Sequence, residues 1–400
     1  MSNLVIVIPT YWTWGSKRAD GPVEAIYDHP TPLDGPSTLP RLLDSLAKLE
    51  GPPFGVLVLI AAVHPDLEDA AAQRVEALIR PYRKHFPIAQ FAAADLQLLR
   101  ERVAAAGFDP AMVALHDYAS VRNCQLIVPY LLGSEVVVAL DDDEVVGSGY
   151  LRIATEFVGE EHPGIGGFYL DRHGSPLLPE GEPTGNPFLD KSVLMNQATR
   201  ALQATPGRLV PTPVVLGGNM VFHRSLWERV SFDPFITRGE DIDYLINAHL
   251  AGFRFLLDKE LTITHLPPEE YGALPYSKLH QDVIRFVYER EKLLLACQRP
   301  ELVEVTPESL DPYPGRFLRE DVVEQALVAL QAKATPETVD RYGLPEAVVA
   351  AAKRHAVQMA PRYFAFAQTW PRLMRALGQD ATLALERFLE EGLTAGGVKG

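Results

Sequence analysis

Short apolar runs alternate with amphipathic segments along the first third of the chain. The runs contain no polar residue and end at turn residues, which predicts strands buried on both faces of a sheet. These strands are 4–8, 56–61 and 136–140. Apolar residues spaced three or four positions apart predict helices at 39–46, 68–79 and 121–130, the last with Ser120 as its N-cap. Strands and helices in this order predict an α/β fold with a mostly parallel sheet.

The rest of the chain departs from this alternation. Residues 164–213 are rich in Gly and Pro and predict a long loop, as do residues 11–40 after the first strand. The next predicted elements are a strand at 214–222 broken by paired glycines, a helix at 239–250, and a strand at 253–265 with a turn near Asp258. Helical spacing prevails afterwards. We therefore expect a catalytic domain over 1–268 and a helical C-terminal region over 269–400.

Four carboxylates, Asp141, Asp142, Asp143 and Glu144, directly follow the apolar run at 136–140. Because α/β sheets place their ligand crevices at the carboxyl ends of strands, we expect this cluster at such a crevice. Crowded carboxylates repel one another, and a divalent cation relieves the repulsion. The sequence therefore predicts a Mg²⁺ or Mn²⁺ site for a phosphate-bearing substrate, with a solvated acidic loop as the alternative.

Composition excludes several classes of function. The chain has 37 Lys and Arg against 52 Asp and Glu, a formal net charge of −15, and no basic run, which argues against nonspecific nucleic-acid binding. No apolar stretch is long enough for a membrane span or a signal sequence, so we expect a cytoplasmic protein without an integral membrane segment. Cys124 and Cys297 provide neither a disulfide framework nor a zinc site, and we expect both in the core.

Short motifs occur in a fixed order along the chain. They are Pro9-Thr10-Tyr11 at the end of the first strand, Arg122-Asn123 some twenty residues before Asp141-Asp142-Asp143, Gly217-Gly218-Asn219 in the broken strand, and Gly239-Glu240-Asp241 followed by Thr264-His265. Together they resemble the family 2 glycosyltransferases with the GT-A fold, over residues 1–268.

This resemblance implies a Rossmann-like nucleotide-diphospho-sugar transferase fold and a hexosyltransferase that uses Mn²⁺ or Mg²⁺. It implies that Asp143, Asp141 and His265 bind the metal, because carboxylate and imidazole suit these ions. It also implies that Asp241 is the base that deprotonates the acceptor, supported by Glu240. The implied donor contacts are Pro9, Thr10, Tyr11, Asp66, Arg122, Asp142, Gly217, Gly218 and Asn219, and the implied acceptor contacts are Trp12 and Arg238.

Two segments depart from the family pattern. Trp12-Thr13-Trp14 stands where relatives have Asn and an acid, and the segment ending at Asp66 replaces their Asp-Asp-Gly-Ser. Both normally hold the nucleotide base, so the base stays open, with Asp66 as a substitute acid and Trp12 as a stacking platform. Aromatic residues that can stack on a sugar or base are Tyr11, Trp12, Trp14, Tyr169 and Tyr271.

Each candidate also has a purely structural explanation. Acids in the first turn of a helix offset its macrodipole, which alone accounts for Glu240 and Asp241. Paired glycines form a bulge, Arg122 forms a salt bridge, and a histidine such as His265 lies on the surface.

Several functions remain open. Inverting transfer of a sugar to a small or glycan hydroxyl acceptor is the leading interpretation. The alternatives are a retaining synthase of a small glycoside, of the glycosylglycerate type, and a non-catalytic nucleotide-sugar-binding protein. Nucleotidyl transfer is disfavoured because no Gly-rich basic loop follows the first strand. The helical region completes the acceptor pocket, forms a homodimer or lies on a membrane, and we favour the homodimer because its faces lack an excess of Lys and Arg.

Overall fold

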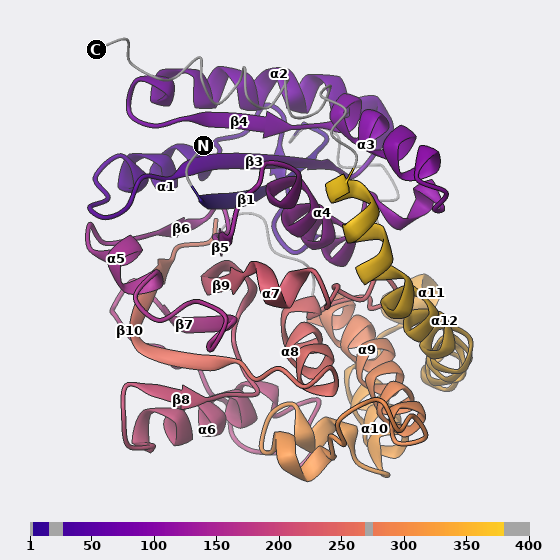
Figure 1. The fold of residues 1–400 in the computed structure, drawn as a ribbon. Coiled ribbons are helices and arrows are strands. Elements are labelled where there is room, and N and C mark those ends of the chain that lie inside the picture. The colour runs from indigo at the N-terminus through magenta and orange to yellow at the C-terminus, as the bar shows by residue number, and fades with distance from the viewer. Residues whose placement is uncertain (1–2, 16–26, 269–274, 380–400) are drawn as a thin grey trace.

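A ten-stranded sheet lies at the centre of the protein. A computed structural model describes residues 3–15, 27–268 and 275–379 (Figure 1). The strand order is β4-β3-β1-β5-β9-β7-β10-β6, with β2 beside β1 and β8 beside β10. The strands are β1 (Leu4–Thr13), β2 (Thr31–Pro32), β3 (Gly55–Ala62), β4 (Ile88–Phe91), β5 (Val136–Ala139), β6 (Glu144–Val145), β7 (Gly164–Leu170), β8 (Leu209–Pro211), β9 (Met220–His223) and β10 (Leu256–His265).

The first four strands of this order, β4, β3, β1 and β5, are all parallel. Strand β9 runs antiparallel between β5 and β7, and β10 is parallel to β7. Helices connect the parallel strands, as the alternating pattern predicts. The expected α/β class, with a mostly parallel sheet and a helical C-terminal region, is confirmed.

Helices cover both faces of the sheet. Along β1, Val5 and Val7 point into one buried cluster, whereas Leu4, Ile6 and Ile8 point into the other, as strand geometry requires. The second cluster lies under α1 (Leu39–Leu46), α2 (Glu68–Ile79) and α5 (Tyr150–Ala154). The first is covered by α3 (Ala93–Ala105), α4 (Tyr118–Leu131), α7 (Arg224–Trp227), α8 (Glu240–Leu250) and the C-terminal helices.

The C-terminal helices share a core with the sheet. They are α9 (Pro275–Ala296), α10 (Val322–Lys333), α11 (Pro336–Tyr342) and α12 (Pro345–Gln379), and Figure 1 shows them gathered beside α4 and α8. Phe286, Leu330 and Trp370 belong to the same buried cluster as Val5 of β1. The indole N–H of Trp370 donates to the carbonyl of Trp227 at 2.7 Å. The segments on the two sides of the predicted boundary near residue 268 thus share one hydrophobic core.

The predicted loop at 164–213 is wrong in large part. It contains β7, β8 and a helix, α6 (Lys191–Ala204). Its glycines reflect close packing: a Cβ at Gly166 would lie 2.1 Å from a methyl of Val215, and one at Gly167 would lie 1.9 Å from the carbonyl oxygen of Leu261. Glycine there permits a tight strand, so its abundance does not mark a loop.

Other local predictions also need correction. Asp117, not Ser120, caps α4, since its Oδ1 accepts the N–H of Ser120 at 2.8 Å. Strand β10 runs through Asp258 without a turn. Cys124 is buried as expected, but Cys297 is exposed. The predicted loop at 11–40 includes the end of β1 and all of β2, while its residues 16–26 lie outside the described part.

Among residues 3–15, 27–268 and 275–379, none of the helices is long and apolar enough to cross a bilayer.

Candidate functional site

The acidic segment lies at the carboxyl end of β5, as predicted, and the pairing of β6 with β10 fixes its position. Glu144 is opposite His265 in this antiparallel pair, and the N–H of Leu266 donates to the carbonyl of Asp143 at 2.9 Å. The guanidinium of Arg41 adds bonds to the carbonyls of Asp143 at 3.2 Å and Leu266 at 2.5 Å. Two segments far apart in the sequence are thereby joined at the sheet edge.

This pairing brings together two of the predicted metal ligands. His265 Nε2 lies 3.2 Å from Asp143 Oδ2, with the side chains 36% and 11% exposed, so ligands from solvent can reach them. Burial lowers the pKa of His265, but the hydrogen bond and charge of Asp143 outweigh burial and raise it. An imidazole beside a carboxylate is a donor set that suits Mn²⁺.

The spacing of this pair fits a shared cation. Two ligands in neighbouring octahedral positions, each about 2.1 Å from a metal, are about 3 Å apart. Within the described part of the chain, no group of three or more His, Cys, Asp or Glu side chains is arranged to hold a metal. The geometry therefore fits a metal that takes most of its ligands from substrate phosphates and water.

Arg122 joins the acidic segment to the predicted catalytic acids. It projects from α4, is only 3% exposed, and its Nη2 donates to Asp141 Oδ1 at 2.7 Å. Its Nε lies 3.4 Å from Glu240 Oε1, and its Nη1 donates to Gln125 at 3.1 Å. The buried guanidinium thus offsets two carboxylates that come from opposite sides of the site.

Glu240 and Asp241 begin α8, after Gly239 in the left-handed conformation (φ 67°). Asp241 is half-buried; its Oδ2 accepts the N–H of Gly217 at 3.0 Å, and its Oδ1 accepts the N–H of Ile242 at 2.7 Å. Burial and the charge of Asp241 raise the pKa of Glu240 to about 7, against the opposing charge of Arg122. Neighbouring carboxyl groups in different environments are typical of acid–base sites.

Glu144 and Tyr169 form the floor between these groups. Glu144 is fully buried, and its Oε2 accepts the N–H of Asp141 at 3.0 Å. Burial and the charges of Asp141 and Asp143 raise its pKa well above the usual value. The hydroxyl of Tyr169 accepts the N–H of Gly218 and lies 3.5 Å from Asp141 Oδ2. The hydroxyl of Tyr169 therefore belongs to the candidate site, although the sequence suggested only a stacking ring.

Two predicted contacts with substrate are wrong. Trp12 is fully buried under α1 and donates its indole N–H to Thr10 Oγ1 at 3.0 Å, so it cannot stack on a base or an acceptor. The side chain of Asn219 is also fully buried. Its Nδ2 donates to the carbonyls of Phe168 at 3.1 Å and Leu261 at 3.3 Å, and its Oδ1 accepts the hydroxyl of Tyr150 at 2.9 Å. Asn219 holds β7 and β10 beside the site and has no free group for a donor.

The first motif is mainly structural. Pro9 and Thr10 are buried, and the Thr10 hydroxyl donates to the carbonyl of Leu59 at 3.2 Å. The ring of Tyr11 packs against those of Tyr27, at 4.3 Å between centroids, and Tyr118, at 5.0 Å. This segment shapes the wall of the site, whereas the side chains of Pro9 and Thr10 do not reach it.

The remaining candidates lie in different environments. Asp66 is exposed after β3, and Asp142 is half-buried, with its pKa raised by burial and by Asp143 and Asp141. Gly217 and Gly218 are buried and use their N–H groups within the protein. Arg238 Nη2 donates to Asp28 Oδ2 at 2.6 Å. Trp14 lies near His64, with ring centroids 5.5 Å apart. Tyr271 lies outside the described residues.

The sequence did not indicate Arg41. Arg41 belongs to α1, and the amphipathic pattern of that helix accounts for its neighbours. None of the sequence motifs includes Arg41. Only the pairing of β6 with β10 reveals that its guanidinium holds the acidic segment.

No protein-family model matches the chain, and no curated protein sequence matches it. Solved structures do show likeness. One is the mannosyltransferase PcManGT from Pyrobaculum calidifontis in complex with GDP-Man and Mn²⁺, with 14% identity and a TM-score of 0.42, covering 95% of this chain and 88% of that one. Another is S. aureus TarS 1–349 in complex with UDP, with 15% identity and a TM-score of 0.42, covering 100% and 93%.

A third is GalNAc-T7 with UDP, GalNAc and Mn²⁺, with 11% identity and a TM-score of 0.38, covering 81% of this chain and 58% of that one. These weak likenesses do not decide the activity, which depends on the residues of the site.

Proposed function

We propose that this protein is a metal-dependent glycosyltransferase that moves a sugar from a nucleotide-diphosphate donor to a hydroxyl acceptor. The observation that carries the proposal is the convergence of four chain segments. Asp143 and His265 lie 3.2 Å apart, and Arg122 bonds both Asp141, two residues before Asp143, and Glu240. A candidate cation-binding pair and a pair of acids thus belong to one polar cluster, which matches the two requirements of sugar transfer: a neutralised leaving group and a base.

Asp143 and His265 would hold the cation, either Mn²⁺ or Mg²⁺, with Asp141 beside them. When bound, such an ion acts as a Lewis acid that neutralises the charge of a leaving diphosphate. Arg122 keeps Asp141 oriented toward the donor side through its 2.7 Å bond. Glu144 and Tyr169 pack beneath the acidic segment and keep water away from its buried side, since Glu144 is fully buried.

We assign Asp241 as the base that removes the acceptor proton, with inversion at the anomeric carbon. Its carboxylate is half-buried and held by the N–H groups of Gly217 and Ile242, which fix its orientation while leaving lone pairs for an acceptor hydroxyl. Glu240 supports it. Retention of configuration in the product, measured by ¹H NMR of the anomeric proton, would favour a retaining synthase.

The test is donor hydrolysis across a panel of nucleotide sugars with Mn²⁺ or Mg²⁺. We expect wild type to turn over one donor, and Asp143→Ala and His265→Ala to lose turnover. Asp69→Ala, which removes an exposed carboxylate from the first turn of α2, should leave turnover unchanged. Absence of turnover with every donor and both ions would contradict the proposal.

A binding measurement separates a transferase from a non-catalytic protein. Calorimetric titration of the protein with UDP or GDP, with and without Mn²⁺, should show metal-dependent nucleotide binding that Asp143→Ala abolishes. Binding without hydrolysis or transfer would identify a nucleotide-sugar-binding protein. The homodimer stays a prediction, which light scattering of the full chain tests.

A further inference from the structure

The strand pairing that brings Asp143 beside His265 is short. Strand β6 has two residues, and both pair with the end of β10. One further backbone bond, from the N–H of Leu266 to the carbonyl of Asp143, extends this ladder. Among the described strands, β6 is the last in the sheet order and has β10 as its neighbour. A ladder this short is marginal by itself, so other contacts must hold the two proposed ligands together.

Arg41 bridges the two sides of this ladder. Its Nη2 donates to the carbonyl of Asp143 at 3.2 Å and to that of Leu266, the residue after His265, at 2.5 Å. The carbonyl of Asp143 thus accepts two hydrogen bonds, from Arg41 and from Leu266, which use both of its lone pairs. Bonds from a guanidinium are charge-assisted and stronger than bonds between neutral groups. Among the described residues, this exposed guanidinium bonds the two carbonyls and no carboxylate.

Helix α1 gives Arg41 a fixed base. Ser45 lies one turn after Arg41 on the same face, and its Oγ accepts the N–H of Val146 at 3.3 Å. The N–H of Glu50, after the helix, donates to the carbonyl of Ser148 at 2.8 Å. Helix α1 therefore follows the acidic segment, and Arg41 supplies the contact at the end where the proposed ligands lie. The leucines of this helix are buried in the core and fix its position: Leu39, Leu42, Leu43 and Leu46.

The charge of Arg41 works against a bound cation. Its Nη2 lies 3.2 Å from the carbonyl oxygen of Asp143, so the guanidinium is close to the proposed ligands, and like charges repel. A positive charge at this place cannot attract a divalent ion. Any benefit of Arg41 to the cation site must therefore come from geometry, which keeps Asp143 Oδ2 and His265 Nε2 at 3.2 Å.

We infer that Arg41 is a positioning residue for the proposed cation pair: its bonds to the two carbonyls keep Asp143 and His265 at the spacing that two ligands of one ion require. The inference rests on the proposed function, because that proposal assigns the two ligands. Arg41 does not coordinate the ion itself, since a guanidinium has no acceptor lone pair. Loss of groups that orient metal ligands commonly costs about 10- to 100-fold in metal affinity.

The test is the gain in affinity for UDP or GDP that Mn²⁺ produces, measured by calorimetry for wild type, Arg41→Leu and Arg41→Lys. Arg41→Leu removes the donor and the charge, and it should reduce this gain by about tenfold or more. Arg41→Lys should retain most of the gain, because a single nitrogen makes both bonds in wild type and the ammonium can replace it.

The direction of the change separates geometry from charge. If Arg41 acted only through its charge, Arg41→Leu would increase the gain, because a repulsive neighbour of the cation is removed. If Arg41 contacted the nucleotide instead, Arg41→Leu would weaken binding equally with and without Mn²⁺, and the gain would not change. Either result would overturn the inference.

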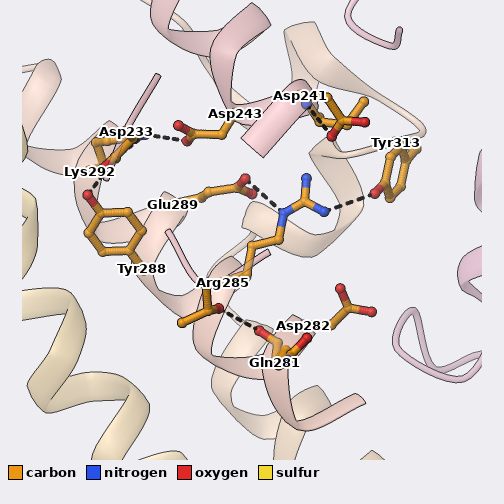
Figure 2. Close-up of polar contacts among 12 residues, drawn as sticks. Asp233, Asp241, Asp243, Gln281, Asp282, Arg285, Tyr288, Glu289, Lys292 and Tyr313 are labelled. Atoms are coloured by element: carbon orange, nitrogen blue, oxygen red, sulfur yellow. Dashed lines mark hydrogen bonds and ion pairs between the residues drawn. The ribbon is translucent and has the colours of Figure 1, made fainter. Parts of the chain in front are cut away.

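Two controls separate positioning from stability. Arg74→Leu removes an exposed arginine from α2 and should leave the gain unchanged. Lys292→Met breaks a buried polar cluster between α8 and α9, in which Lys292 Nζ donates to Asp233 Oδ2 at 2.9 Å and also to Asp243 Oδ1 (Figure 2). That variant should lose stability but, while folded, keep the gain. Arg41 is exposed, so Arg41→Leu is expected to fold; thermal melts check this, and Arg41→Gln carries the same test if it does not.

A second readout needs no metal. Because the N–H of Leu266 donates to Asp143, its hydrogen exchange reports how firmly the two segments are joined. This exchange should be faster in Arg41→Leu than in wild type, whereas the N–H of Glu50 should keep its rate. If wild type shows no Mn²⁺-dependent nucleotide binding, the proposed function fails, and faster exchange at Leu266 alone supports the positioning role. If wild type and Arg41→Leu show the same gain, only the positioning role fails.

Discussion

Replacing Lys292 by Met tests whether the polar cluster between α8 and α9 stabilises the fold. Lys292, Asp233 and Asp243 have no exposed side-chain surface, and the ammonium bonds both carboxylates. Removing one member of a buried ion pair costs about 3–5 kcal/mol, because the remaining charge is left uncompensated. After the substitution Asp233 keeps two donors, the hydroxyl of Tyr288 at 2.6 Å and the N–H of Phe235 at 2.9 Å, and Asp243 keeps the amide of Asn247 at 2.7 Å. We therefore expect the lower end, about 3 kcal/mol at pH 8.

The loss should depend on pH in a direction that the structure fixes. Burial raises the pKa of Asp243 to about 6 in the native protein, even with Lys292 opposing the shift. Without Lys292 this pKa rises further, so the native variant takes up a proton at a pH where the unfolded chain does not. The free energy of unfolding of the variant thus recovers relative to wild type as pH falls from 8 toward 6.

The assay is urea denaturation followed by tryptophan fluorescence at pH 8 and pH 6. Lys353→Met, an exposed substitution on α12, is the matched control and should change stability by less than about 0.5 kcal/mol. In the double variant Lys292→Met with Asp243→Asn, the loss should be smaller than in Lys292→Met alone, because one of the two uncompensated carboxylates is then neutral. A loss below about 1 kcal/mol at pH 8, or an equal loss at both pH values, would refute this reasoning.

Three further predictions follow from the site. Glu240→Gln should raise the free energy of unfolding by up to about 3 kcal/mol at pH 8 and leave it unchanged at pH 4. The reason is that the raised pKa of Glu240 destabilises the native state only above the pKa of the unfolded chain. Urea titrations measure the difference, and equal stability of the two proteins at pH 8 would contradict this prediction. Gly218→Ala should abolish turnover and cost about 1–3 kcal/mol, since its Cβ would lie 2.0 Å from Glu144 Oε1, whereas Gly181→Ala meets no atom within 4 Å and should be neutral in both assays. Trp12→Ala should lower stability by about 3–5 kcal/mol in thermal and urea melts, and a change confined to the acceptor KM would show that the ring reaches substrate after all.

The sequence predicted the parts of the fold that depend on local pattern. The apolar strands and the amphipathic helix α2 lie where expected, because burial on one or both faces directly dictates residue type. It failed at β7, where glycines serve tight packing against Val215 and Leu261. A single sequence cannot distinguish such glycines from those of a loop.

Only some of the predicted site residues lie together in the fold, for a similar reason. Asp143 and His265 meet because the short strand β6 pairs with the end of β10, which matches the motif order. Trp12 was misassigned because strand β1 continues past the expected end and turns this ring into the core. Arg41 carries no local signal, since its partners are set by the tertiary fold.

The bond between Trp370 and Trp227 has a consequence for synthesis of the chain. The two residues are 143 positions apart, so at about 5–20 residues per second Trp227 leaves the ribosome roughly 7–30 s before its partner. During that interval the apolar face of α4 lacks α12, which packs against it in the folded protein, and apolar surface stays exposed. The nascent protein is therefore expected to require a holding chaperone until α12 arrives, and conditions that slow translation of the last third should increase aggregation.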